Sequence, residues 1–209
     1  MAYFPILLEL DGLPCLVAGG GKLGAHKAET LLRAGADVTV CAPEICPETA
    51  ALPVKLLRRA VAAEDVAGMC LVVDATGDAA AYRVLSEACR ALHVPFNSAC
   101  RVDGGSAIFP AVHRQGRTVL AVSSLGASPV ASARLRDALA AHIPAEMDAI
   151  LDAMAALRSV SRAAFPRQTT RRAFLRRSLD QMLSLGRALT EAETDAIIRE
   201  IQNTEETEE

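Results

Sequence analysis

The feature that most constrains this sequence is a glycine-rich turn near its start, GGGKLG at residues 19–24. A short apolar run at 14–18 precedes the turn, and an apolar pattern of helical spacing follows it at 22–34. In GxGxxG, the glycine at 19 allows a tight turn, that at 21 lets a phosphate approach the backbone, and that at 24 lets helix and strand pack closely. Because Gly19, Gly21 and Gly24 lie between a predicted strand and a predicted helix, they predict a dinucleotide-binding site.

The residues after the second predicted strand, 37–41, bear on the choice of cofactor. An acid that binds the ribose 2′-hydroxyl usually ends this strand. Cys41 stands there instead, and the nearest carboxylate is Glu44. No arginine follows the strand directly, which argues against a site for a 2′-phosphate. NAD is therefore favoured, while the choice between NAD and NADP stays open.

The order of predicted strands and helices changes at about residue 105. Before it, strands predicted at 54–57, 69–75 and 94–98 alternate with a helix at 79–92, which indicates a parallel sheet with helices on both faces. After it come two strands around a Gln115-Gly116 turn, at 107–112 and 118–123, and then helices at 129–141, 145–161, 168–185 and 190–203. The predicted fold is α/β: a Rossmann-like parallel-sheet domain over 1–113, a short connecting segment over 114–144, and a helical C-terminal domain over 145–209.

Composition excludes several classes of protein. With 51% hydrophobic and 22% charged residues, the chain of 209 residues is not intrinsically disordered. A formal net charge of -3 and the lack of tryptophan disfavour nucleic-acid binding. No apolar run is long enough for a membrane span, and the N-terminus does not resemble a signal peptide. Six cysteines without a CxxC pair indicate reduced, buried thiols, so we expect a cytoplasmic protein without a metal site.

The small net charge conceals two opposite blocks near the C-terminus. Residues 158–187 contain eight arginines and one acid, whereas residues 188–209 contain eight acids and one arginine. Two interpretations remain open. The basic block binds a polyanionic small molecule, or the acidic tail neutralises it and both are solvated helix faces.

Several segments together resemble the precorrin-2 dehydrogenase family, which includes the N-terminal module of sirohaem synthases. The resemblance covers about residues 4–145 and weakens in the C-terminal helices. It rests on PILLEL, the glycine turn through APE, DATGD, FNSA, SAIFPA and VSSLGASPVASARLR, in that order. It implies NAD-dependent oxidation of precorrin-2 to sirohydrochlorin in tetrapyrrole biosynthesis. It also implies a homodimer in which 114–144 is the dimerisation segment.

The resemblance also implies roles for individual residues. Lys22 and Leu23 would contact the pyrophosphate, Pro43 and Glu44 would flank the adenosine, and Thr76 and Asn97 would line the nicotinamide side; Ser124, Gly126 and Ser128 would lie by the tetrapyrrole. Two of these positions have a plainer alternative. The Thr76-Gly77-Asp78 turn also fits an ordinary helix cap, and Ser128 before a proline fits an ordinary N-cap.

One departure from the family concerns the acid/base group. Family members carry an aspartate three residues after the asparagine, where this chain has Cys100. Asp103 follows three residues later and is the preferred candidate for the proton acceptor, ahead of Cys100, with a third alternative in which neither is essential. Because metal insertion depends more on such a group than the oxidation does, we expect a dehydrogenase in which iron insertion is doubtful.

The basic block fits the same reading, since precorrin-2 is a polycarboxylate. Arg171 and Arg172 are the candidate substrate-binding residues. The main rival is an NAD-binding sensor or regulatory module without turnover. A generic short-chain reductase is disfavoured, because Tyr82 is followed at the required spacing by Ser86 instead of lysine.

Overall fold

The computed structural model describes residues 3–101 and 104–208, which form two compact units. The first unit contains the chain up to Phe109 together with Ser123–Ser128, and the second contains Pro110–Val122 together with the chain from Pro129 onward. Strand β6 (Ala111–Gln115) begins the second unit, so the boundary expected at residue 113 falls inside this strand.

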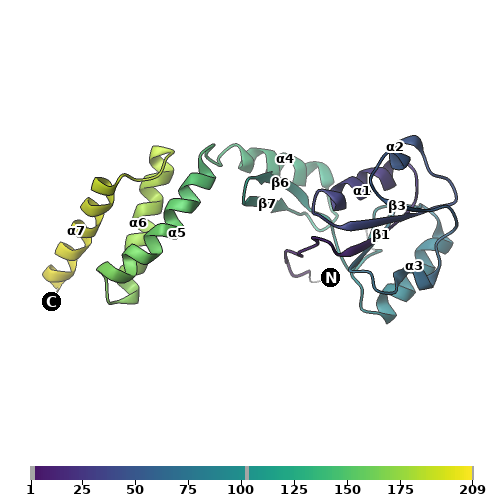
Figure 1. Ribbon diagram of the computed structural model, residues 1–209, viewed down its shortest axis with the longest axis horizontal. Helices are drawn as coiled ribbons and strands as arrows, with labels where there is room; N and C mark the ends of the chain where they lie inside the picture. Colours follow the sequence, from purple (N-terminus) through teal and green to yellow (C-terminus); the bar gives the residue numbers. More distant parts are fainter. Residues whose placement is uncertain (1–2, 102–103, 209) are drawn as a thin grey trace. The chain divides into compact units, whose positions relative to one another are not determined.

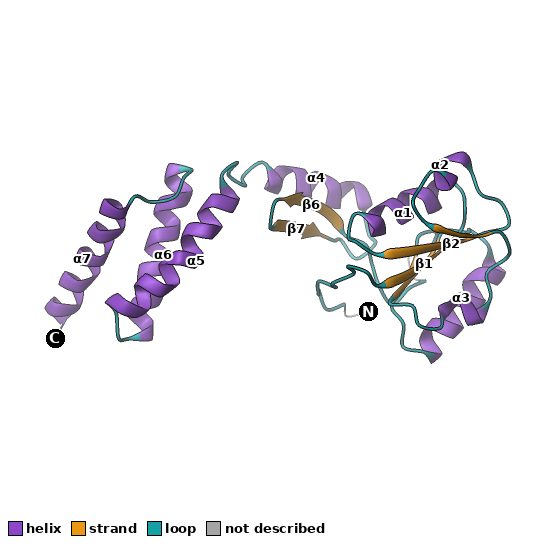
Figure 2. Cartoon of the chain, in the orientation of Figure 1, coloured by secondary structure: helices purple, strands orange, loops and turns teal. Residues whose placement is uncertain are grey.

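A parallel sheet forms the centre of the first unit (Figure 2). It has five strands in the order β3-β2-β1-β4-β5. Its strands are β1 (Pro14–Ala18), β2 (Asp37–Cys41), β3 (Lys55–Leu57), β4 (Leu71–Asp74) and β5 (Phe96–Ser98). Every neighbouring pair is parallel, which confirms the predicted Rossmann-like α/β fold. The direction of strand order reverses between β1 and β4, and this switch point is where such sheets bind ligands, at the carboxyl ends of the strands.

Helices cover both faces of this sheet, as Figure 1 shows. Helix α1 (Lys22–Leu32) packs on one face through its buried side, which includes Ala25, Ala28 and Leu31. Gly35, with φ +82°, lets the chain turn after α1 and enter β2. The opposite face carries α3 (Ala79–Ala91) and the 3₁₀ helix η1 (Ala63–Val66).

Two short elements were not expected, and one expected strand is shorter. The four-residue α2 (Pro47–Ala50) and η1 are too short to show a helical period in the sequence. The strand expected at 107–112 begins only at Ala111. The Asn97 side-chain Nδ2 donates to the Ala107 carbonyl at 2.9 Å, and Pro110 has no N–H to donate, so the segment before Ala111 cannot form a regular ladder.

The second unit starts with a hairpin and a helix packed on it. Strands β6 and β7 (Thr118–Val122) pair antiparallel around the expected turn, where Gly116 has φ +53°. Helix α4 (Pro129–Ala140) packs against both strands and begins at the predicted proline. Arg117, in the turn of the hairpin, links it to the next helix, because its guanidinium donates a hydrogen bond to the Asp152 carboxylate at 2.6 Å.

Three helices complete this unit: α5 (Met147–Ala164), α6 (Gln168–Leu185) and α7 (Glu191–Glu208). Their core contains Phe165 and Phe174, whose ring centroids lie 5.5 Å apart. The predicted capping box opens α7, because the Thr190 N–H donates to Glu193 Oε2 at 2.8 Å and the Glu193 N–H donates to Thr190 Oγ1 at 3.3 Å. Helix α7 runs past the expected end at residue 203.

Two expectations from composition can be compared with the structure. None of the helices in the described residues is both long enough and apolar enough to span a membrane. All six cysteines are free, and Cys15, Cys41 and Cys89 are buried as expected. The expectation of burial is wrong for Cys100, which is exposed because it lies in the loop beyond the end of β5.

Candidate functional site

The glycine turn crosses the carboxyl edge of the sheet at the switch point. Gly19 has φ +117°, and a Cβ on it would lie 2.6 Å from the carbonyl oxygen of Ala75, which follows β4. Its N–H donates to the Cys41 carbonyl at 3.0 Å, which joins the turn to the end of β2. Only glycine permits this backbone conformation and this close approach to β4.

The two other glycines of the motif play opposite physical roles. A Cβ on Gly24 would overlap the Gly19 carbonyl, so Gly24 is required for α1 to pack against the turn. A Cβ on Gly21 would meet nothing within 4 Å, so the space beside its backbone is open. No side chain caps α1 at Gly21, and no acid lies in its first turn. The first N–H groups of α1 are therefore available to a pyrophosphate, which is the fit that a dinucleotide requires.

The middle glycine of the turn, Gly20, is a site residue that the motif does not include. Its carbonyl accepts hydrogen bonds from the Cys46 N–H at 2.9 Å and from the buried Thr49 hydroxyl at 3.0 Å. A Cβ on it would overlap the Glu44 carbonyl. The loop after β2 therefore holds the glycine turn in place, and the run of three glycines was the only signal for this in the sequence.

The loop after β4 is fixed by its own hydrogen bonds. The buried Asp74 accepts from both the N–H and the hydroxyl of Thr76, at 3.0 and 2.7 Å. The same hydroxyl accepts from the Asp78 N–H at 3.0 Å, and Asp78 caps α3 by accepting from the Ala80 N–H at 2.7 Å. The helix-cap interpretation of this turn is thus confirmed. Thr76 remains at the switch point, but its hydroxyl is already engaged.

Asn97 lies one strand away, in β5, where its neighbour in β4 is Val73. Its Nδ2 donates to Ala107, while its buried Oδ1 has no hydrogen-bond partner among the described residues. The next side chain, Ser98, also has a buried hydroxyl with no partner in that part of the chain. A buried acceptor without a partner is costly unless a ligand satisfies it, and the carboxamide N–H of a nicotinamide is suited to do so.

The segment after β5 returns along the edge of the sheet at 104–109. The Phe96 N–H donates to Ser106 Oγ at 3.0 Å, and the Phe96 carbonyl accepts from the Ala107 N–H at 2.9 Å. Lys27 of α1 places its Nζ 4.8 Å from the centroid of the Phe109 ring, and burial there lowers the pKa of Lys27. The segment is therefore held against Phe96 and against α1. Asp103 lies outside the described residues.

The residues predicted to flank the adenosine lie in the loop after β2. Pro43 and the exposed Glu44 follow β2 directly, and the backbone of Glu44 lies over Gly20. Beside them, Arg59 forms a bidentate ion pair with Asp65, with N–O distances of 2.7 and 2.5 Å. This pairing lowers the pKa of Asp65. Sequence reasoning missed the pair because it comes from the end of the neighbouring strand β3.

The predicted tetrapyrrole residues belong to different units of the chain. Ser124 and Ser128 close a tight loop, in which the Ser124 hydroxyl accepts from the Ser128 N–H at 2.9 Å. Leu125 has a positive φ of 53°, an uncommon backbone conformation for a leucine, whereas Gly126 adopts its φ of 88° without strain. The other two candidates, Arg171 and Arg172, lie on α6 in the second unit, and neither forms an ion pair with any residue in the described ranges.

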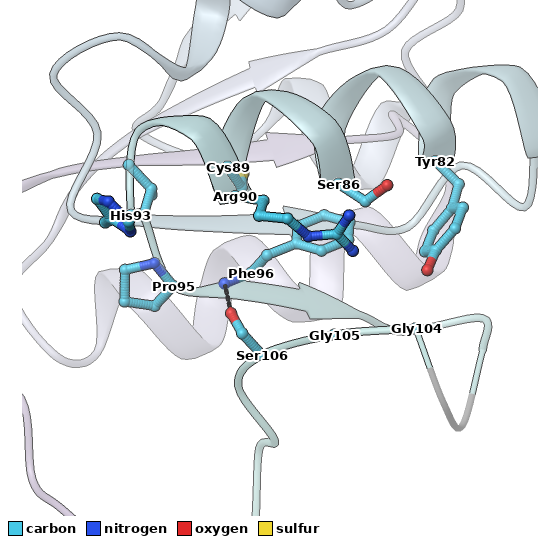
Figure 3. A pocket seen from close by; sticks show the side chains of 11 residues that line it. Tyr82, Ser86, Cys89, Arg90, His93, Pro95, Phe96, Gly104, Gly105 and Ser106 are labelled. Carbon is cyan, nitrogen blue, oxygen red and sulfur yellow. Dashed lines mark hydrogen bonds between the residues drawn. The ribbon is translucent and has the colours of Figure 1, made fainter.

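A cavity of about 540 Å³ opens between α3 and the segment at 104–106 (Figure 3). Phe96 and Pro95 lie on its apolar side, and Ser86 and Arg90 from α3 contribute polar groups. None of the predicted cofactor residues lines this cavity. Within residues 3–101 and 104–208, no cluster of His, Cys, Asp or Glu has the geometry to hold a metal ion.

The chain resembles siroheme synthases in sequence. It is 35% identical over 184 residues to the "Siroheme synthase" of Methylococcus capsulatus, covering 86% of this chain and 39% of that protein. It is 37% identical over 186 residues to "Siroheme synthase 1" of Halorhodospira halophila, covering 86% of this chain and 38% of that protein. The chain thus spans about two-fifths of the length of these curated relatives.

A solved structure and a family model both match the part of the chain that contains the glycine turn. The solved structure "SirC, precorrin-2 dehydrogenase" matches with a TM-score of 0.66 at 22% identity, over 96% of this chain and all of that one, a likeness in fold. Residues 6–111, half of the chain, match the family described as "Putative NAD(P)-binding". That match spans the glycine turn, the switch point and the loop after β2. The chain belongs to this NAD(P)-binding family.

Proposed function

We propose that this protein is an NAD-dependent precorrin-2 dehydrogenase that forms sirohydrochlorin in sirohaem biosynthesis. The observation that carries the proposal is the carboxyl edge of the sheet, which offers open space at Gly21, a helix start without a side-chain cap, and the buried Asn97 Oδ1, which has no partner among the described residues. The names of the siroheme synthase relatives and of the SirC structure supply the substrate.

The protein's own groups bind and orient the reactants. Gly21, Lys22 and Leu23 present backbone N–H groups to the pyrophosphate, and Gly24 keeps α1 close enough to do so. Asn97 Oδ1 orients the nicotinamide through its carboxamide. When bound, NAD⁺ supplies the hydride acceptor. The accompanying proton passes to the Asp103 carboxylate, or to Cys100 if that residue is present as the thiolate, and iron insertion is weak because the aspartate expected at position 100 is missing.

The arginines of α6 extend the proposal to the substrate's carboxylates. Arg172 is exposed and Arg171 half-buried, on the same helix as Arg176 and Arg177. Among the side chains that the structure describes, the acidic helix α7 pairs with this basic surface through Arg177 and Glu200, at 3.3 Å. Charge-assisted bonds from arginine suit a polycarboxylate such as precorrin-2. Ser124, Gly126 and Ser128 are proposed to contact the same substrate.

We further propose a homodimer that pairs through the segment at 114–144. Its helix α4 exposes Val130, Leu135 and Leu139, which are 74%, 56% and 50% accessible, and the adjacent β6 exposes Val112. Apolar surface of this extent on one hairpin and helix is typical of an interface. A cytoplasmic location, expected from cysteine usage, stays a prediction.

The reaction itself provides the decisive experiment. Under anaerobic conditions, precorrin-2 and NAD⁺ should yield sirohydrochlorin with stoichiometric NADH, followed by absorbance at 340 nm, without any added metal. Added Fe²⁺ should not raise sirohaem formation above the uncatalysed rate. Asp103→Asn should slow the oxidation more than Cys100→Ser does, by about tenfold or more, because a general base contributes about 10²–10⁴-fold.

Three outcomes would revise this proposal in different ways. Tight NAD⁺ binding without NADH production would favour the sensor module. Robust iron insertion would contradict the expectation drawn from Cys100. Equal, small effects of both variants would mean that neither residue is essential.

Replacing Arg171 and Arg172 together with alanine should raise the apparent KM for precorrin-2 about tenfold or more and leave that for NAD⁺ within about twofold, because charge-assisted bonds of about 1.5–3 kcal/mol each would be lost. Steady-state kinetics with each substrate varied in turn measures both constants. Arg199→Ala on α7 is the matched control, since it removes an exposed arginine from the acidic helix. Equal rises in both constants would count against a substrate role.

A further inference from the structure

The carboxyl ends of β2 and β3 are joined to the glycine turn by a continuous set of hydrogen bonds. The Gly19 N–H donates to the Cys41 carbonyl at 3.0 Å, and the Ala42 N–H donates to the Leu57 carbonyl at 3.0 Å. Residues after β3 are therefore two strands away from the turn, about 10 Å at the usual strand spacing. An adenosine that extends from the pyrophosphate over β2 reaches this part of the edge.

At this edge the chain turns sharply at Arg58. The Arg59 N–H donates back to the Leu57 carbonyl at 3.0 Å, so Arg58 is the apex of a three-residue turn just after β3. The Arg58 side chain is exposed. It makes no hydrogen bond or ion pair with another residue in the described part of the chain, so its charge is available to a ligand.

Neighbouring groups hold the turn in place but do not neutralise the positive charge of Arg58. Arg59 lies between Asp65, which it binds through both nitrogens, and Cys41, whose Sγ donates to the Arg59 carbonyl at 3.4 Å. Asp65 is thereby occupied by Arg59. Cys41, which is buried, stands where an acid would bind the ribose 2′-hydroxyl, so the last residue of β2 presents no carboxylate to a 2′-phosphate.

We propose that Arg58 is a cofactor-specificity residue that binds the adenosine 2′-phosphate, so that this protein accepts NADP⁺ as well as NAD⁺. The exposed Glu44, two residues beyond Ala42, remains as the carboxylate that suits the 2′-hydroxyl of NAD⁺. The sequence disfavoured a phosphate site because no arginine follows β2, whereas the fold brings one from β3. The inference rests on the proposed dinucleotide site and is independent of the substrate that is oxidised.

Calorimetric titration with adenosine fragments tests this without turnover. The unmodified protein should bind 2′,5′-ADP at least as tightly as ADP. Arg58→Ala should weaken 2′,5′-ADP about tenfold or more, the scale of one charge-assisted hydrogen bond, and change ADP by less than about twofold. Arg58→Lys should restore part of the loss. Arg90→Ala, an exposed arginine on the last turn of α3, is the matched control and should change neither.

The alternatives are distinguishable. If the unmodified protein binds 2′,5′-ADP more than about tenfold more weakly than ADP, or if Arg58→Ala weakens both ligands equally, the proposal is overturned and the site is specific for NAD. If neither fragment nor NAD⁺ binds, the dinucleotide site itself is wrong, and the proposed function fails with it. Circular dichroism of each variant confirms that the fold is intact.

Discussion

Gly21→Ala is expected to weaken NAD⁺ binding about 10- to 100-fold while changing the free energy of unfolding by less than about 1 kcal/mol. Gly21 has φ -84° and ψ -174°, which alanine adopts without strain, and its Cβ would meet no atom of the protein within 4 Å. The added methyl group would instead occupy the space through which a pyrophosphate approaches the start of α1. The loss should therefore appear in binding and leave the fold intact.

Calorimetric titration with NAD⁺ and urea unfolding followed by circular dichroism measure the two quantities separately. Gly12→Ala is the control with the opposite expected outcome. Gly12 also has open space around it, but its φ is +66°, and it precedes β1 at the opposite edge of the sheet from the glycine turn. The variant should lose about 1–2 kcal/mol of stability and keep its affinity for NAD⁺. If Gly21→Ala binds NAD⁺ as tightly as the parent, the phosphate does not approach at this glycine.

Gly24→Ala should do the reverse and destabilise the protein by about 2–3 kcal/mol, with loss of NAD⁺ binding as a consequence. A Cβ at Gly24 would overlap the Gly19 carbonyl oxygen and lie 2.8 Å from its carbonyl carbon. Both are backbone atoms of the turn, so no side chain can rotate to make room. The helix must move away from the turn, which removes the geometry that binds the pyrophosphate.

This expectation opposes the general rule that glycine to alanine inside a helix is stabilising by up to about 1 kcal/mol. Urea unfolding of Gly24→Ala decides between the two. His26→Ala, on the exposed side of α1, is the control and should stay within about 0.5 kcal/mol of the parent. A more stable Gly24→Ala variant would show that α1 and the turn are not in close contact.

Much of the first unit could be predicted because its signals are local. Strand β1, the glycine turn and α1 are consecutive in the chain, and the predicted bounds of β1 and β2 agree with the structure. The capping box of α7 needs only Thr190 and Glu193. The segment before β6 was expected as a strand but bonds instead to Phe96 and to the Asn97 side chain, about ten residues back in the chain, which no local pattern shows.

The sequence by itself determined the alternation of strands and helices, the glycine motif and the segregation of charge, because each of these depends on residues close together in the chain. Only the tertiary structure decided which residues meet at the carboxyl edge. Parallel pairing of β2 with β3 places Arg58 and Arg59 beside Cys41, and the loop after β2 encloses Gly20. Such neighbours come from different strands, and the pairing that joins them is set by burial of both sheet faces, which no local pattern specifies.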